Sequence, residues 1–329
     1  MKEEDIRPQE VFDKYLELAR EDAITYFSTA DRDMGCCPAC GERGEFAFDK
    51  NGFTYEICNS CLTLYVNPRP AVSAFLRYYT ESPSSKFWAT TFYKITAEAR
   101  RNRLWKPKAK AIHEIALRYF KGSTAPTIID IGGGYGIFAE EMRELIETSP
   151  IVIEPGPSLA EICRQKGLRV VEKFLEDVTK ADVPQGSKLF ASFELFEHLH
   201  NPERFLRCIH DLMSGSDIFI FTTLSGMGVD IQVLWEHSKS VTPPHHLNFF
   251  NPKSIKLLLA RTGFDVLDVT TPGKLDLDIL HNSKQLIGDR FWRNFIETAS
   301  AEERESWQQF VSSSGRSSHM MVICQKRPI

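Results

Sequence analysis

From residue 111 onward, short apolar runs alternate with stretches whose hydrophobic residues recur at helical spacing. The apolar runs are rich in β-branched and aromatic residues, which is typical of strands, and the stretches between them are typical of amphipathic helices. Seven strands are expected, at residues 127–131, 150–154, 168–171, 188–193, 217–223, 264–270 and 319–325. This alternation indicates an α/β fold with a doubly wound, mainly parallel, seven-stranded sheet of the Rossmann-like kind.

The first third of the chain has a different pattern. Residues 4–29 carry apolar residues at helical spacing, and we expect a helix that docks on the rest of the protein. Residues 71–120 are also expected to be helical, dense in aromatic side chains and interrupted at Pro83. We therefore divide the chain into an N-terminal helix (1–33), a cysteine-rich module (34–70), a helical linker or lid (71–122) and an α/β domain (123–329).

Four of the eight cysteines form two C-x-x-C pairs, separated by 17 residues that include the turn signal Asn51-Gly52. Four thiolates on two such turns match the ligand set of tetrahedral Zn²⁺. A site of four thiolates is closed to water, so the zinc ribbon expected at 34–70 is structural and not catalytic. Cys36 is an additional cysteine that competes with Cys37 for the same position as a zinc ligand. The expected ligands are Cys37, Cys40, Cys58 and Cys61.

Composition and charge narrow the class of partner. The 329 residues have a net charge of −4, and the cysteine module holds more acidic than basic residues, which argues against nucleic acid. No run of about 18 apolar residues is present, so no membrane span is expected. The charged N-terminal sequence lacks the apolar core of a signal peptide, and we expect a cytoplasmic protein.

The central motif of the α/β part follows its first strand. Residues 130–136 are Asp-Ile-Gly-Gly-Gly-Tyr-Gly, between an apolar strand and a helical stretch. Glycines permit a tight turn and a close approach of the backbone to a ligand, and the next helix begins with unpaired N–H donors. Dinucleotide-binding folds also use a glycine turn, but with the spacing G-x-G-x-x-G. Here the glycines at 132, 134 and 136 recur at every second position.

This D-x-G-x-G-x-G pattern resembles motif I of the class I S-adenosylmethionine-dependent methyltransferases. In that family an acidic residue at the end of the next strand binds the ribose hydroxyls, and Glu154 stands at that position here. The resemblance also implies that the last two strands form an antiparallel hairpin, and that residues after the fourth strand reach the reactive end of the cofactor. The implied residues that bind S-adenosylmethionine are Asp130, Gly132, Gly133, Gly134, Gly136, Glu154, Pro155, Phe193 and Glu194.

Two further motifs carry histidines. Residues 194–202 match E-x-x-E-H-L-x-x-P, a pattern found after the fourth strand of many small-molecule methyltransferases, in which the histidine, here His198, is usually a structural hydrogen bonder. A long loop at 224–248 leads into H-H-L-N-F-F-N, which is similar in part to a stretch of the deoxysugar C-methyltransferases, enzymes with a four-cysteine zinc module of their own. The candidate base of those enzymes aligns with His246, although a packing or helix-capping role is the alternative. Beside His245 and His246 no acidic residue stands at a convincing metal-ligand spacing.

Three functions fit these observations. The first is S-adenosylmethionine-dependent methylation of an oxygen or carbon of a small polar acceptor, such as a sugar, a nucleotide-sugar or a glycan precursor, with His246 as the catalytic residue. The second is an RNA-modifying methyltransferase whose zinc ribbon grips RNA, supported by a basic group at 100–110. The third is a non-catalytic binding protein with the same fold. We favour the first, with S-adenosylmethionine and a structural Zn²⁺ as cofactors.

Overall fold

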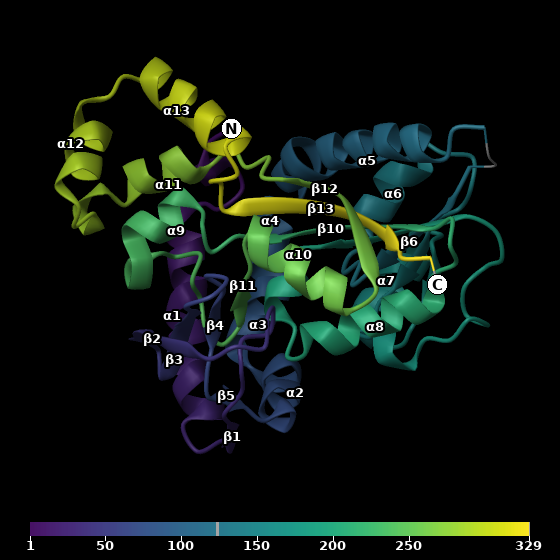
Figure 1. Ribbon diagram of the computed structural model, residues 1–329, viewed down its shortest axis with the longest axis horizontal. Coiled ribbons are helices and arrows are strands. Elements are labelled where there is room, and N and C mark those ends of the chain that lie inside the picture. Colours follow the sequence, from purple (N-terminus) through teal and green to yellow (C-terminus); the bar gives the residue numbers. More distant parts are fainter. Residues whose placement is uncertain (123–124, 329) are drawn as a thin grey trace.

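The computed structural model describes residues 1–122 and 125–328. Its main layer is a seven-stranded sheet with the order β12-β13-β10-β9-β6-β7-β8 (Figure 1). The last five strands in this order are parallel to one another. They are β6 (Thr127–Ile131), β7 (Ile151–Ile153), β8 (Arg169–Val171), β9 (Lys188–Phe193) and β10 (Ile218–Leu224). β13 (His319–Lys326) is antiparallel to both β10 and β12 (Phe264–Thr270). The predicted sheet is confirmed, and each strand lies within about one residue of its expected bounds.

Helices cover both faces of this sheet. One face packs against α5 (Lys106–Tyr119) and α6 (Ile137–Arg143), and the other against α8 (Pro202–Leu212) and α10 (Pro252–Arg261). Side chains alternate along each strand, so Ile128 of β6 joins the first core and Ile129 joins the second. α7 (Pro157–Gln165) connects β7 to β8. The sheet is apolar on both sides because both of its faces are covered.

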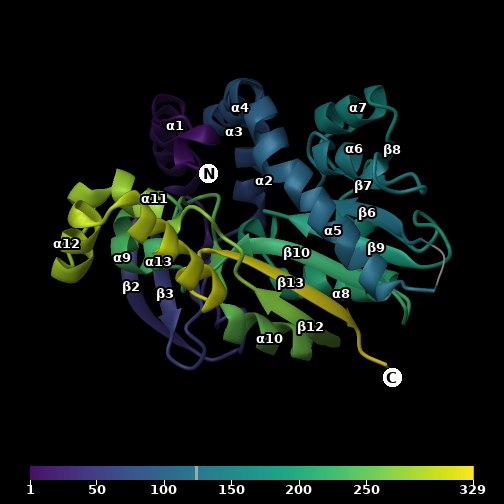
Figure 2. The ribbon, with the colours of Figure 1, turned by 90° about the horizontal axis from the view of Figure 1, so that it is seen from above.

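The segments before the sheet form a helical layer beside it (Figure 2). The helix expected at 4–29 is present as α1 (Gln9–Phe27), and the expected break at Pro83 separates α2 (Val72–Glu81) from a long helix that ends at Tyr119. Proline is favoured at the start of a helix, where its missing N–H costs nothing. The long helix contains two π-helical turns. Its parts before α5 are α3 (Pro83–Phe87), η2 (Trp88–Phe92), α4 (Tyr93–Arg100) and η3 (Arg101–Trp105).

The cysteine module contributes a second, smaller sheet. β2 (Gly44–Lys50) and β3 (Phe53–Cys58) form the expected hairpin, whose two turn residues both have positive φ. β3 pairs with β4 (Leu64–Val66), and β4 pairs in turn with β11 (Asn248–Phe249), which comes from the long loop after β10. A separate two-stranded pair joins β1 (Arg32–Asp33) to β5 (Arg69–Pro70). The long loop is therefore fastened to the cysteine module.

A group of helices extends beyond the end of the sheet, at the left of Figure 1. Their apolar side chains share one core, which includes Leu234, Leu277 and Ile296. The helices are α9 (Val229–Leu234), α11 (Asp276–Asn282), α12 (Arg290–Thr298) and α13 (Ala301–Ser313). The remaining short turns are η1 (Glu3–Asp5), η4 (Leu175–Asp177), η5 (Phe196–His198), η6 (Trp235–His237) and η7 (Lys284–Leu286). Within residues 1–122 and 125–328, no helix is long and apolar enough to cross a membrane.

Candidate active site

The glycine turn after β6 is linked to the acidic end of β7. Gly132, Gly134 and Gly136 all have positive φ, which only glycine adopts without strain. The N–H of Gly134 donates to Glu154 Oε2 at 2.9 Å. The other carboxylate oxygen accepts from Gly156 N–H at 2.8 Å, across the half-buried Pro155. A Cβ placed on Gly134 meets no protein atom within 4 Å, so the turn borders open space.

Asp130 lies buried beneath this turn. Its side chain is 2% exposed, and its Oδ2 has no hydrogen-bond partner among the described residues. Burial raises the pKa of Asp130 to about 7, the nearby Glu154 adds to the rise, and Lys108 opposes it. A Cβ on Gly133 would lie 2.7 Å from Oδ2, so only glycine lets the backbone pass this carboxylate. Two neighbouring carboxylates without cation partners suit a positively charged ligand.

The end of β9 brings a charged group to the same edge of the sheet. Phe193 is buried, and Glu194 follows it with a φ of 52°, a strained conformation for a residue with a side chain. Glu194 Oε1 accepts from Thr222 Oγ1 at 2.7 Å and lies 3.3 Å from Lys108 Nζ and 3.5 Å from His319 Nδ1. Burial alone would raise the pKa of Glu194, but His319, Lys108 and the Thr222 hydroxyl hold it well below its usual range. The carboxylate is therefore ionised.

The loop after β9 joins this edge to the histidine loop. Leu195 packs against the glycine turn, since its side chain lies 2.8 Å from a Cβ built on Gly132. Glu197, His198 and His246 each place one potential ligand atom within 4.8 Å of the others. Burial and then Glu194 raise the pKa of Glu197 to about 8.

The two ring systems of this cluster are held by backbone carbonyls. Nδ1 of His198 contacts the carbonyl oxygen of His245 at 2.9 Å, and Nδ1 of His246 contacts that of Ser240 at 2.6 Å. A carbonyl only accepts hydrogen bonds, so each Nδ1 carries the hydrogen and each Nε2 keeps its lone pair. Burial and the neighbouring His198 lower the pKa of His246 to about 3, so this ring is neutral at physiological pH.

His245, by contrast, is enclosed by aromatic side chains. It is 8% exposed, packs between Tyr15 and Tyr78, and its Nε2 is hydrogen-bonded to the Tyr78 hydroxyl. Its surroundings are those of a core residue. Farther along the helical layer, the ring of Tyr93 stacks on Tyr135 of the glycine turn with ring centroids 3.5 Å apart. The helical layer therefore touches the turn directly.

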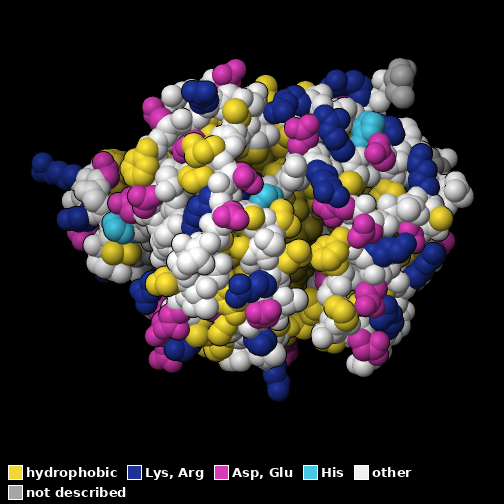
Figure 3. All heavy atoms as spheres, turned by 90° about the horizontal axis from the view of Figure 1, so that it is seen from below, with side chains coloured by type: hydrophobic (Ala, Val, Ile, Leu, Met, Phe, Trp, Pro, Cys, Tyr) yellow, Lys and Arg dark blue, Asp and Glu magenta, His cyan; other side chains and the backbone are white. Residues whose placement is uncertain are grey.

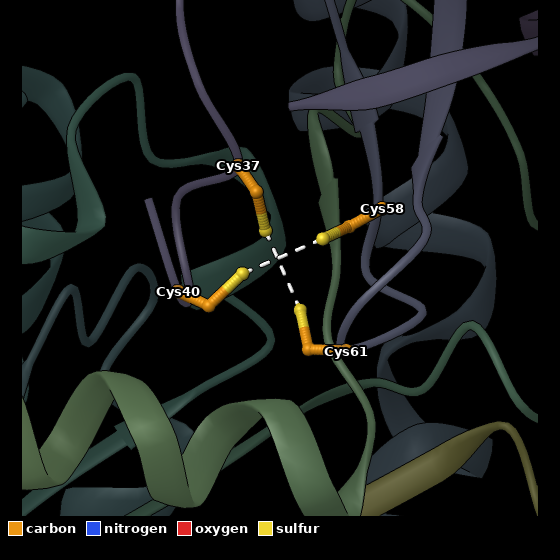
Figure 4. Close-up of side chains that lie close together, drawn as sticks. All are labelled: Cys37, Cys40, Cys58 and Cys61. Atoms are coloured by element: carbon orange, nitrogen blue, oxygen red, sulfur yellow. Dashed lines mark hydrogen bonds between the residues drawn. The ribbon is translucent and has the colours of Figure 1, made fainter. Parts of the chain in front are cut away.

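The four predicted cysteines converge (Figure 4). The Sγ atoms of Cys37 and Cys61 are 3.5 Å apart, and those of Cys40 and Cys58 are 3.4 Å apart. A tetrahedral zinc ion with bonds of about 2.3 Å requires sulfur atoms about 3.8 Å apart, so the four thiols fit Zn²⁺ with little adjustment. Cys36 is exposed and lies outside the cluster.

The cysteine module also holds the histidine loop in place. The Tyr55 hydroxyl donates to the carbonyl oxygen of His246 at 2.7 Å, and Val66 N–H donates to the carbonyl oxygen of Leu247 at 2.9 Å. On the other side, Asn251 Nδ2 donates to the carbonyl oxygen of Cys61 at 2.8 Å. These contacts fix the backbone on both sides of β11. The module is thus part of the frame that positions His246.

Sequence reasoning missed several parts of this site. Lys108 and His319 flank Glu194 through contacts between distant segments. His319 belongs to no motif, and Lys108 was noted only as a member of the basic group at 100–110. The pairing of β11 with β4 involves strands of two and three residues, too short for a periodic signal. The meeting of Glu197 with His246 was also not expected, because the two residues lie in different loops.

The chain also matches a known sequence family. The sequence profile described as "Methyltransferase domain" matches residues 92–269, more than half of the chain. No curated protein matches the sequence. Among solved structures, the plantazolicin methyltransferase BamL, in complex with a triazolic desmethylPZN analog and SAH, is 12% identical, with a TM-score of 0.49 over 77% of this chain and 94% of that one.

Two other solved structures are similar at the same level. The plantazolicin methyltransferase BpumL, in complex with a pentazolic analog and SAH, is 11% identical, with a TM-score of 0.48 over 77% of this chain and 95% of that one. A SAM-dependent methyltransferase from Archaeoglobus fulgidus is 18% identical, with a TM-score of 0.44 over 67% and 94%. Together, the matched profile, the strand order and the glycine turn show that this chain belongs to the methyltransferase-domain family, as a class I S-adenosylmethionine-dependent methyltransferase.

Proposed function

We propose that this protein transfers the methyl group of S-adenosylmethionine to an oxygen or carbon of a small polar acceptor, with a sugar or nucleotide-sugar as the class to test first. One observation carries the proposal. The loop at 194–198 connects the glycine turn to the histidine cluster, so a cofactor on the turn and an acceptor at His246 would meet at the ends of β6 and β9. Ligands of open α/β sheets bind at this edge.

The cofactor would lie along the ends of β6, β7 and β9. Glu154 is placed to accept from the ribose hydroxyls, and Gly134 opens the space beside the turn. Asp130, Gly132, Gly133, Gly136 and Pro155 shape the turn and its neighbour, and Phe193 and Glu194, at the end of β9, would lie toward the reactive end of the cofactor. The sulfonium is a good leaving group, so the enzyme has to align the acceptor and help to remove its proton.

His246 is the residue we propose to act on the acceptor. Its Nδ1 donates to the Ser240 carbonyl, so its Nε2 carries the lone pair that would accept the proton. In the transfer step the acceptor atom forms a bond to the methyl carbon while the C–S bond breaks. The electron pair of the C–S bond goes to sulfur, and the proton of the acceptor goes to Nε2 of His246. The histidine cluster and the cofactor turn thus supply the two halves of one reaction.

Basic and aromatic side chains near the cluster support a polar, anionic acceptor. Arg100 lies over the Trp88 ring, 5.9 Å from its centroid, and its Nε has no hydrogen-bond partner in the described part of the chain. Burial lowers the pKa of Arg100 to about 10, and repulsion from Arg7 adds to this effect. Neither arginine forms an ion pair with a carboxylate within residues 1–122 and 125–328. A phosphate or carboxylate on the acceptor would pair with them.

The surface supports a small acceptor over a nucleic acid. On the face seen from below, Lys and Arg side chains are interspersed with Asp and Glu around a hollow bordered by hydrophobic side chains (Figure 3). Mixed charge of this kind does not form the basic stripe that tracks a phosphate backbone. The cysteine module also forms hydrogen bonds with the histidine loop and with α10, for example from Arg261 Nη1 to the Ala39 carbonyl oxygen at 2.9 Å. These surfaces of the module are therefore covered by protein and are not free to bind RNA.

The test is a transfer assay with methyl-labelled cofactor, in which nucleotide-sugars are compared with free sugars and with RNA. We expect labelled product from a nucleotide-sugar, and a loss of about 10²- to 10⁴-fold in kcat for His246→Asn, the range associated with general base catalysis. Asparagine keeps a donor toward Ser240, so the loop should stay folded. His237→Asn is the control, because His237 is exposed. Unchanged kcat in His246→Asn would remove His246 from the mechanism, and RNA as the sole methylated acceptor would replace the proposed substrate class.

A further inference from the structure

A second set of metal-binding side chains lies outside the cysteine module. Glu197 and His198 come from the turn after β9, and His246 comes from the loop before β11. One potential ligand atom of each lies within 4.8 Å of the other two. Within the described residues, no hydrogen bond joins these three side chains to one another. The three potential ligand atoms are therefore close together and are not hydrogen-bonded to one another.

Both histidines are already oriented as metal ligands usually are. A histidine that binds a metal commonly donates its second ring N–H to a carbonyl or carboxylate, which fixes the tautomer and the ring plane. His198 makes this contact with the carbonyl oxygen of His245, and His246 makes it with that of Ser240. Each Nε2 is left with an in-plane lone pair, the form in which imidazole binds a cation.

Glu197 supplies the anionic ligand. It is 2% exposed, and its Oε2 accepts from Thr223 Oγ1 at 2.9 Å, which holds the carboxyl group in one orientation. Glu197 forms no ion pair with a lysine or arginine in the part of the chain that the structure describes. Ionising this buried carboxyl group is costly unless it is paired or bound to a metal. A cation between Glu197 and the two rings would stabilise the ionised form, which is the form that binds a metal.

We propose that Glu197, His198 and His246 bind one divalent transition-metal ion at the acceptor side of the site. Two imidazoles and one carboxylate favour ions such as Mn²⁺, Fe²⁺ or Zn²⁺ over Mg²⁺ or Ca²⁺. Metal bonds of about 2.1 Å place tetrahedral ligand atoms about 3.4 Å apart. Side-chain rotations that move the three ligand atoms by roughly 1 Å would therefore bring them to bonding distance of one ion. Three protein ligands leave coordination positions open to an oxygen of the acceptor.

This inference deepens the proposed function and rests on it for the place of the acceptor. An acceptor hydroxyl bound to the cation loses its proton more easily. Its oxygen then bonds to the methyl carbon, the C–S electron pair goes to sulfur, and the proton is released to water. His246 acts here as a ligand of the cation, and the cation replaces its ring as the group that activates the hydroxyl. Metal binding therefore decides between the two roles of His246.

The experiment is a titration with Mn²⁺ of protein that carries one zinc ion per chain by elemental analysis, so that only the four-thiolate site is filled, and the electron paramagnetic resonance signal of unbound Mn²⁺ is followed. Mn²⁺ is chosen because it has little affinity for the four-thiolate site. We expect one saturable Mn²⁺ per chain, and an affinity at least about tenfold lower in Glu197→Gln and in His246→Asn. Glutamine still accepts from Thr223 and asparagine still donates to Ser240, so each variant removes the ligand atom and keeps its support. The exposed His237→Asn should bind Mn²⁺ like the wild type.

Absence of saturable Mn²⁺ binding, or equal affinity in the wild type and Glu197→Gln, overturns the metal site. Zinc content and circular dichroism of each variant show that it is folded, and Glu197→Gln answers the question if His246→Asn does not fold. S-adenosylmethionine binding is measured on the same preparation without Mn²⁺. Cofactor binding and methyl transfer in protein that holds no metal beyond one zinc ion per chain would leave the proposed function standing and refute the role of the cation alone.

Discussion

Asp130→Asn should change how the stability of the protein depends on pH. The side chain is 2% exposed, its Oδ2 has no partner within the described residues, and burial raises its pKa to about 7. The substitution keeps the shape of the side chain and removes the charge. In a protein without ligand, a buried charge next to Glu154 is a cost that the asparagine variant does not carry.

The magnitude follows from the two pKa values. The unfolded chain releases the proton near 3.8, and the folded protein keeps it up to about 7. The folded state therefore binds more protons between these values, and its stability falls as the pH rises through this window. A difference of about three pKa units corresponds to roughly 4 kcal/mol at 1.36 kcal/mol per unit. Roughly 2.5 kcal/mol of this loss falls between about pH 5 and pH 8.

The assay is urea unfolding of zinc-replete wild type and Asp130→Asn at pH 5 and pH 8, in the absence of cofactor. The free energy of unfolding of the variant, relative to that of the wild type, should rise by about 2 to 3 kcal/mol between the two pH values. Glu305→Gln is the control, because Glu305 is exposed and has no ion pair or side-chain hydrogen bond within the described residues, so it should show no such change. An equal difference between variant and wild type at both pH values would show that the Asp130 carboxyl group does not lose its proton in this pH range.

Two further predictions concern zinc and the glycine turn. Cys58→Ser should lower bound zinc, stability and methyl transfer together, because the cysteine module holds the histidine loop, while the exposed Cys36→Ser should change none of them; full zinc occupancy in Cys58→Ser, measured by elemental analysis, would contradict this. Gly134→Ala puts a methyl group into open space at a φ of 55°, so we expect about 1 kcal/mol of lost stability and at least about tenfold weaker binding of S-adenosylmethionine by calorimetry. Gly215→Ala, which meets no atom within 4 Å and lies outside the left-handed region, should leave both unchanged; equal cofactor affinity in the two variants would show that the space beside Gly134 is not the cofactor site.

The sheet could be predicted from the sequence because its signals are local. Each strand is an apolar run of a few residues, and the glycine turn and the two C-x-x-C pairs are fixed by short spacings. The choice between Cys36 and Cys37 remained open in the sequence, and the structure places Cys36 on the surface, outside the cluster of four cysteines. Such local patterns can be read from the sequence because the residues that form them are neighbours along the chain and stay neighbours in the folded protein.

The acceptor side could not be predicted because it depends on segments that are far apart in the chain. His246 was singled out from a partial resemblance, but Glu197 and His198 reach it only through the packing of two loops. Lys108 of α5 and His319 of β13 likewise contact Glu194, although both are far from it in the sequence. The sequence also left open whether His245 shares the chemistry, and its contacts with Tyr15 and Tyr78 are those of a core residue.

The most direct test of the account is a calorimetric titration of zinc-replete protein with S-adenosylmethionine. We expect saturable binding of one cofactor per chain, competition by S-adenosylhomocysteine, and at least about tenfold weaker binding in Gly134→Ala. These results would place the cofactor on the turn at 132–136. Absence of binding in folded, zinc-replete protein, or normal binding in Gly134→Ala, would contradict the assignment of that turn as the cofactor site.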